Sequence, residues 1–306
     1  MVMKSISVAK ITNPKVTDVL IRKRLFQIID ANRTRPIIWL SSPAGAGKTT
    51  LVASYLAASN LPSLWYQMDE GDSDPATFFY YLRLAVKQLY PKKYKSLPLF
   101  TPEYFQSVSI FAKRYFEILY NTLKPPCSIV FDNYQDVPAN SLFHAMIVHG
   151  LDIIPEGINV IIVSRNELHP AYARLYANNK ISVIGWDEIR FTIAETRDIA
   201  KKKYQRTISA ETIQQLHTSA DGWIAGILLM AESVTKGGVS YQSGKVSTHK
   251  LIFDYFAGEI LEKMEKVTRE FLLKTSFITR MTAKIAEKIV TIQRKYFRIY
   301  LTGNMR

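Results

Sequence analysis

The stretch that decides the fold is IIWLSSPAGAGKTTLVASYL, from Ile37 to Leu56. An apolar run gives way to small residues, then to Gly-Lys-Thr-Thr, and becomes apolar again at helical spacing. Pro36–Ser41 therefore reads as a buried strand, and the residues from Lys48 to about Ala58 read as a helix. Because only small residues let the backbone N–H groups wrap closely around an anion, the pattern predicts a loop that binds the phosphates of a nucleotide.

The polar residues at the end of this loop have separate predicted roles. Lys48 places an ammonium beside the β- and γ-phosphate oxygens, the Thr49 hydroxyl can bind Mg²⁺ at the start of the helix, and Thr50 would reach the α-phosphate. The general pattern is G-x-x-x-x-G-K-[ST], and this chain has Ser42 at its first position. A chance loop of small residues is the alternative. The predicted nucleotide-binding residues of the loop are Pro43, Ala44, Gly45, Ala46, Gly47, Lys48, Thr49 and Thr50.

Two later strands end in residues that suit the same chemistry. Asp132 closes the apolar run CSIVFD and is predicted to hold the Mg²⁺ shell together with Thr49, although a strand-terminal Asp that caps a turn is the alternative. Asn133 stands where many ATPases carry a second carboxylate that polarises the attacking water, which predicts slow hydrolysis. Arg165 follows the strand NVIIVS and can contact the γ-phosphate, or else pair with a surface carboxylate.

Short apolar runs alternate with helical patterns in the first half of the chain, which is typical of a parallel α/β sheet. Strands are predicted at 36–41, 62–68, 127–132 and 159–164. Asp74 and Pro75 are predicted to start one helix, and Thr101–Pro102–Glu103 another that runs to about Thr122. A further helix is predicted near 141–148. Beyond about residue 185 only helices are predicted, with Thr192 and Ser209 as caps. A Gly- and Ser-rich stretch at 235–248 predicts a linker, and two amphipathic helices follow it.

The bulk composition excludes several classes of protein. A chain of 306 residues with 47% hydrophobic residues can bury a large core and divide into about two or three domains. It has no uncharged apolar run of about eighteen residues and no secretory h-region, so we expect a cytoplasmic protein without a membrane span. Its single cysteine, Cys127, is expected in the core. The net charge of +14 fits nucleic acid, acidic ligands or a solvated basic surface equally well.

The ordered series of motifs resembles one family over nearly the whole chain, from about Lys15 to Ile289. The matching segments are SSPAGAGKTTLVASYL, LWYQMDEGDSDPATFFYYLRLAV, SIVFDNYQDV, VIIVSRNELHP, FTIAETRDIA, DGWIAGILLMAES and, further on, DYFAGEILEKM with REFLLKTSFI. They look like the ATPase module of MalT-like, large ATP-binding LuxR-type transcriptional regulators, which belong to the STAND class of signal-transducing P-loop ATPases. The resemblance implies an α/β P-loop NTPase sheet with helices on both faces, followed by a helical lid and a partial winged-helix unit.

The same resemblance implies the domain limits and the ligands. It divides the chain into a P-loop core at 1–185, a lid at 186–236, a linker at 237–248 and a partial winged-helix unit at 249–306. It implies ATP or ADP with Mg²⁺ as ligands, and it places Ile21 and Arg22 against the adenine, although a basic helix start is the other reading of that segment. Ile224 replaces the proline that the family often carries in its lid motif.

The resemblance leaves three functions open. The first is an ATP/ADP-binding switch module with slow hydrolysis, which can self-associate and which lacks sensor repeats and a helix-turn-helix, so that DNA binding by this chain alone is not expected. The second is an AAA+-type ATPase that acts on nucleic acid. The third is a truncated pseudo-ATPase that serves as an interaction fragment. The basic and aromatic ending TIQRKYFRIYLTGNMR favours a truncated or frameshifted product.

Overall fold

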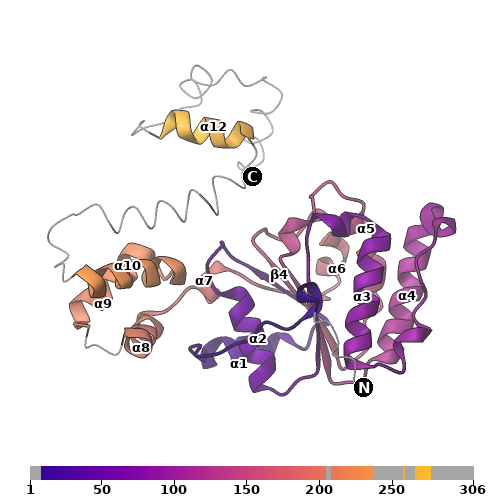
Figure 1. Cartoon of the computed structure of the whole chain (residues 1–306), viewed down its shortest axis with the longest axis horizontal. Helices are drawn as coiled ribbons and strands as arrows, with labels where there is room; N and C mark the ends of the chain where they lie inside the picture. Colours follow the sequence, from indigo (N-terminus) through magenta and orange to yellow (C-terminus); the bar gives the residue numbers. More distant parts are fainter. Residues whose placement is uncertain (1–7, 205–207, 238–257, 259–265, 277–306) are drawn as a thin grey trace, which may run out of the picture. The chain divides into compact units, whose positions relative to one another are not determined.

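The computed structural model of the chain describes residues 8–204, 208–237, 258 and 266–276 (Figure 1). The chain divides into two compact units, and the boundary between them falls after Ala231. Within the described part of the chain, no helix combines the length and the apolar character that crossing a membrane requires.

A five-stranded parallel sheet forms the centre of the first unit. The order across the sheet is β2-β3-β4-β1-β5. The register pairs Ser41 of β1 with Ser164 of β4, and Gln67 of β2 with Asp132 of β3. The carboxyl ends of β1, β4 and β3 therefore meet at one edge of the sheet, where ligands bind in open α/β sheets. The strands are β1 (Ile37–Ser41), β2 (Ser63–Gln67), β3 (Cys127–Asp132), β4 (Ile158–Ser164) and β5 (Ile181–Ile184).

Helices cover both faces of this sheet, as predicted. Figure 1 shows α3, α4 and α5 on one side and α1 and α2 on the other. Strand side chains alternate between the two sides, so that Ile37 and Trp39 enter the larger core cluster and Ile38 and Leu40 enter the smaller one. Because both faces are buried, the strands are continuous apolar runs. Cys127 is fully buried in the larger cluster, which confirms its predicted place in the core.

Several helices begin where the sequence predicts. Helix α3 starts at Pro75, and the Asp74 side chain accepts hydrogen bonds from the two amides that follow it. The Thr192 hydroxyl accepts from the Glu195 amide at the start of α8, and Ser209 caps α9. The helices are α1 (Lys23–Asn32), α2 (Lys48–Ala58), α3 (Pro75–Leu89), α4 (Val108–Thr122), α5 (Phe143–Leu151), α6 (Ala173–Ala177), α7 (Trp186–Ile189), α8 (Ile193–Tyr204), α9 (Ala210–Ala220), α10 (Ile224–Gly237) and α12 (Lys266–Thr275).

Two elements differ from the prediction. The helix expected from Thr101 begins instead as a 3₁₀ segment, η4 (Pro102–Ser107), in which Thr101 makes no capping bond. Ser107, with φ −137° and ψ 38°, interrupts the helical backbone, so α4 starts only after it. The edge strand β5 was not predicted, because it has only four residues and includes Ser182 and the exposed Val183.

The described residues of the second unit are few. Helix α12 lies where the sequence predicts an amphipathic helix. The predicted linker at 237–248 lies outside the described residues apart from Gly237, which ends α10. The remainder of the predicted unit at 249–306 also lies outside them, apart from residues 258 and 266–276.

Candidate functional site

The small residues between β1 and α2 form a tight loop at the carboxyl edge of the sheet. Gly45 and Gly47 have φ values of 70° and 84°, in the left-handed region that suits glycine. Gly47 is the N-cap of α2, and its carbonyl accepts the Leu51 amide at 2.9 Å. The loop thus presents its backbone at the amino end of α2, where free N–H groups and the helix dipole favour an anion.

Lys48, the first residue of α2, folds its ammonium back over this loop. Its Nζ donates to the carbonyl oxygens of Ser42 at 2.5 Å and Pro43 at 3.0 Å. Burial of the side chain and the nearby Arg165 lower the pKa of Lys48 to about 8, and Asp132 opposes that shift. The ammonium is therefore held by neutral acceptors, and phosphate oxygens would offer stronger, charge-assisted ones.

The two predicted Mg²⁺ ligands lie in direct contact. Thr49 Oγ1 donates to both carboxylate oxygens of Asp132, at 3.1 and 3.0 Å. Burial raises the pKa of Asp132, while hydrogen bonds from Thr49 and from the Asn133 amide oppose the rise. A hydroxyl and a carboxylate are the hard oxygen donors that Mg²⁺ takes, so the pair fits this ion.

Ser42 supplies a second sign that the loop is built for a ligand. It stands at the first position of the loop, where the general pattern has glycine, and it is only 3% exposed. Among the described residues its Oγ finds no hydrogen-bond partner. A buried hydroxyl without a partner costs free energy, and a bound ligand or water can supply that partner.

The residues that follow β3 and β4 are joined by a side chain that the sequence analysis missed. Asn133 has a left-handed backbone, with φ 55°, and the short helix η5 (Tyr134–Asp136) follows it. Gln135 Oε1 accepts the backbone N–H of Arg165 at 3.0 Å, and Gln135 Nε2 donates to Asp136. Gln135 thus links the segment after β3 to the first residue after β4 at this edge of the sheet.

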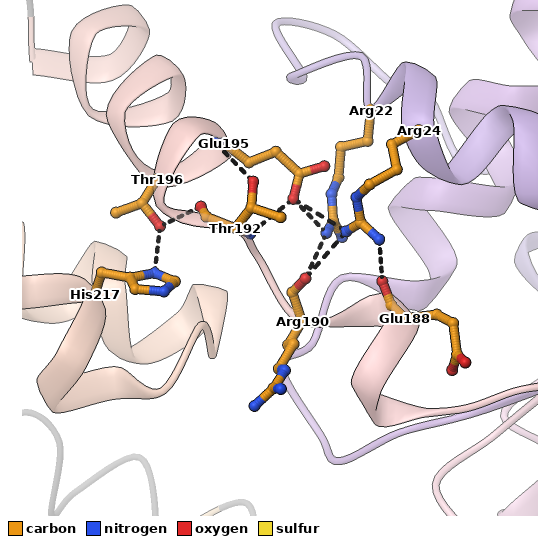
Figure 2. Close-up of polar contacts among 8 residues, drawn as sticks. All are labelled: Arg22, Arg24, Glu188, Arg190, Thr192, Glu195, Thr196 and His217. Atoms are coloured by element: carbon orange, nitrogen blue, oxygen red, sulfur yellow. Dashed lines mark hydrogen bonds and ion pairs between the residues drawn. The ribbon is translucent and has the colours of Figure 1, made fainter.

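Arg22 lies at the centre of an ionic cluster, shown in Figure 2, that joins the start of α1 to the start of α8. Its Nη2 donates to Glu195 Oε2 at 2.8 Å and to the Arg190 carbonyl at 3.0 Å, and its guanidinium covers the Phe191 ring with 4.0 Å between the guanidinium carbon and the ring centroid. Arg24 Nη2 donates to the same Glu195 oxygen at 3.3 Å. The side chain proposed to lie against adenine is therefore also a structural clamp, whereas its neighbour Ile21 is 46% exposed.

Glu195 has a second task in this cluster. Its Oε2 also accepts the Thr192 amide at 2.9 Å, which completes the capping box of α8. Burial alone would raise the pKa of Glu195, but hydrogen bonds from Arg22 and Thr192 and the two guanidinium charges hold it below its usual value. One carboxylate thus fixes both the start of α8 and the core segment beside it.

Residues at the start of α10 also contact the loop between β1 and α2 directly. Trp223 Nε1 donates to the Ala44 carbonyl at 2.7 Å, and the Ala225 amide donates to the Gly45 carbonyl at 3.2 Å. A Cβ built on Gly47 would lie 3.6 Å from the Ile224 side chain. The sequence analysis did not identify Trp223, Glu195, Arg24 or Gln135, and the only local signal among them is the Thr192-x-x-Glu195 capping pattern.

No protein-family model matches the sequence. It is 26% identical over 289 residues to the HTH-type transcriptional regulator MalT of Klebsiella pneumoniae, an alignment that covers 92% of this chain and 32% of that protein. The figures for MalT of Cronobacter sakazakii are the same. The chain spans about a third of the length of these relatives. The resemblance to MalT-like regulators is confirmed at the level of sequence.

The fold comparison agrees with the predicted class. The Walker-type ATPase PABY2304 of Pyrococcus abyssi superposes with a TM-score of 0.59 at 11% identity, over 92% of this chain and 87% of that chain. Similarity at this identity defines the fold alone. The chain therefore has the fold of a P-loop ATPase, and its sequence is similar to the part of MalT that it covers.

Proposed function

We propose that this chain binds ATP and ADP with Mg²⁺ and acts as the nucleotide-dependent switch module of a MalT-like transcriptional regulator. The observation that carries the proposal is the meeting of three features at one edge of the sheet. These are a loop with two glycines at positive φ, the buried Lys48 ammonium over that loop, and the Thr49–Asp132 pair beside it. Together they match the requirements of a bound phosphate chain and its metal ion.

In this proposal, different residues of the loop contact different phosphates of the nucleotide. Backbone amides of residues 43–48 would donate to the β-phosphate, Lys48 would reach the β/γ oxygens, and Thr50 the α-phosphate. Thr49 and Asp132 would hold Mg²⁺, which neutralises charge that develops on the phosphates. The buried Ser42 hydroxyl, which has no hydrogen-bond partner among the described residues, could donate to or accept from a ligand bound in this loop.

Hydrolysis should be slow. Asn133 can orient a water through its amide, but an amide takes no proton at neutral pH, whereas general-base assistance contributes roughly 10²–10⁴-fold. Arg165 would contact the γ-phosphate from the end of β4 and so distinguish ATP from ADP. A nucleotide-binding module with no turnover is the second candidate, because Asn133 favours it, and single-turnover measurements separate the two.

The lid is the part of the module that we expect to respond. We propose a core at 1–185, a lid at 186–236, a linker at 237–248 and a partial winged-helix unit at 249–306. Lid residues contact both the phosphate-binding loop, through Trp223, and the start of α1, through Glu195. A nucleotide that alters either contact would bias the lid between two arrangements, as P-loop switches do.

Titration of a fluorescent ATP analogue into the wild-type chain and the Lys48→Ala variant tests the proposal. Loss of this charge-assisted contact, worth about 1.5–3 kcal/mol, should weaken binding roughly ten- to a hundredfold. The variant should keep its fold, because Lys48 meets loop carbonyls and not the apolar core. Equal affinity in the two proteins, with competition by ATP and ADP in neither, would remove the nucleotide-binding assignment.

A further inference from the structure

The contact between the start of α10 and the phosphate-binding loop involves backbone carbonyls in the middle of that loop. Trp223 holds the Ala44 carbonyl and Ala225 holds the Gly45 carbonyl, at 2.7 and 3.2 Å. Both bonds come from the lid, and the residues they join are far apart in the sequence. The lid thus acts on two successive peptide planes of the loop.

The orientation of a peptide plane fixes its N–H as well as its C=O. In a trans peptide the carbonyl and the following N–H point in opposite directions, and the described chain has only one cis peptide, at Pro125–Pro126. Because Trp223 holds the Ala44 carbonyl toward the lid, the Gly45 N–H points away from the indole. The Ala225 bond turns the Ala46 N–H in the same way, and that amide has only a long bond, 3.4 Å, to Pro43.

The chain on either side of the indole is packed closely at two glycines. Gly222 has φ 73°, and a Cβ there would lie 2.5 Å from the Phe191 carbonyl oxygen. A Cβ on Gly226 would lie 2.5 Å from the indole ring. Phe191 donates its amide to the Gly222 carbonyl at 2.9 Å, and its ring packs under the Arg22 guanidinium, so the backbone just before Trp223 is tied to a residue that contacts Arg22.

We propose that Trp223 is a positioning residue for the phosphates of the bound nucleotide. Through the Ala44 carbonyl it orients the Gly45 amide, so it acts on ligands that carry a phosphate chain and not on the nucleoside alone. The inference rests on the proposed nucleotide binding and adds to it a residue and a mode of action. Loss of one such hydrogen bond should weaken ADP and ATP binding roughly two- to tenfold.

Affinities of ADP, ATP and adenosine for the wild-type chain, Trp223→Phe and Gly226→Ala test this inference. Trp223→Phe removes the N–H and keeps an aromatic ring, whereas Gly226→Ala keeps the N–H and displaces the indole. We expect both variants to lose affinity for ADP and ATP and to keep the wild-type affinity for adenosine. Trp186→Phe, at the start of α7, is the matched control and should bind all three ligands as the wild-type chain does.

Each other outcome has a distinct meaning. An equal loss of affinity for adenosine and ADP would show that Trp223 only supports the fold. Unchanged ADP affinity in both variants would show that Trp223 does not act on the loop. Either result overturns the inference. Failure of the wild-type chain itself to bind ADP would instead refute the proposed function. Thermal unfolding of each variant, followed by circular dichroism, confirms that the proteins compared are folded.

Discussion

Replacing Glu195 with alanine should destabilise the first unit by more than the loss of a helix cap. The capping box of α8 accounts for about 1 kcal/mol. The ion pair contributes the larger part, because the Arg22 and Glu195 side chains are only 6% and 14% exposed. Removing one partner of a buried pair costs about 3–5 kcal/mol. We expect the lower end, about 3 kcal/mol, because Arg22 keeps its bond to the Arg190 carbonyl.

Glu188→Ala is the matched control for this change. Glu188 Oε2 also accepts an amide at a helix start, that of Gly185, at 2.9 Å, but its carboxylate is not the acceptor on which Arg22 and Arg24 converge. In a unit of this size 1 kcal/mol shifts Tm by about 2–4 °C, so Glu195→Ala should melt about 6–12 °C below Glu188→Ala. Thermal unfolding by circular dichroism measures the difference. Equal melting temperatures would refute the claim that the ion pair holds α8 against the start of α1.

The lowered pKa of Glu195 makes the stability difference between the wild-type chain and Glu195→Ala depend on pH. A carboxyl whose folded pKa lies below its usual 4.5 stabilises the fold above that value, and the contribution disappears as the pH falls through the folded pKa. The difference in unfolding free energy between the wild-type chain and Glu195→Ala should therefore have its full value at pH 7 and should decrease in acid below about pH 4.5. A gap that widens in acid would contradict the assignment.

Two further predictions concern the nucleotide site. Burial lowers the pKa of Lys48 to about 8, so the affinity for ADP should be constant below that pH and should fall above it. Calorimetric titrations between about pH 6.5 and 9 measure this dependence, and the Lys48→Ala variant should not show it. Asn133→Asp should raise the rate of single-turnover ATP hydrolysis about tenfold or more with little change in ATP affinity, because a carboxylate can accept a proton from the attacking water. An unchanged rate would mean that this position does not face the attacking water.

The sheet could be predicted from the sequence because its strands are buried on both faces. Runs such as IIWLS and CSIVFD stay apolar regardless of which side chain faces which layer, so β1 and β3 stand out without an alignment. The short strand β5 lacks this signal. The meeting of Thr49 and Asp132 was also predictable, because Asp132 ends one parallel strand and Thr49 lies at the start of the helix that follows another.

The contacts that residues 190–225 make with α1 and with the loop after β1 could not be predicted in the same way. The Arg22–Glu195 and Trp223–Ala44 bonds join residues that are distant in the sequence, and they depend on how the helical segment after β5 packs against the rest of the first unit. The sequence resemblance predicts that Arg22 lies against adenine, and nothing in the local pattern indicates that the Glu195 carboxylate holds it. Local propensity and spacing specify elements and loops, whereas such docking contacts depend on tertiary packing.

The central claim, that the loop after β1 holds a phosphate chain, is tested most directly by the amide resonances of its glycines. The chain has 13 glycines, and selective ¹⁵N labelling reports each of them. On addition of Mg²⁺ and ADP, the Gly45 and Gly47 signals should shift, while Gly157, which precedes β4 at the opposite edge of the sheet, should not. Unmoved Gly45 and Gly47 signals at ADP concentrations that saturate the protein would contradict the account.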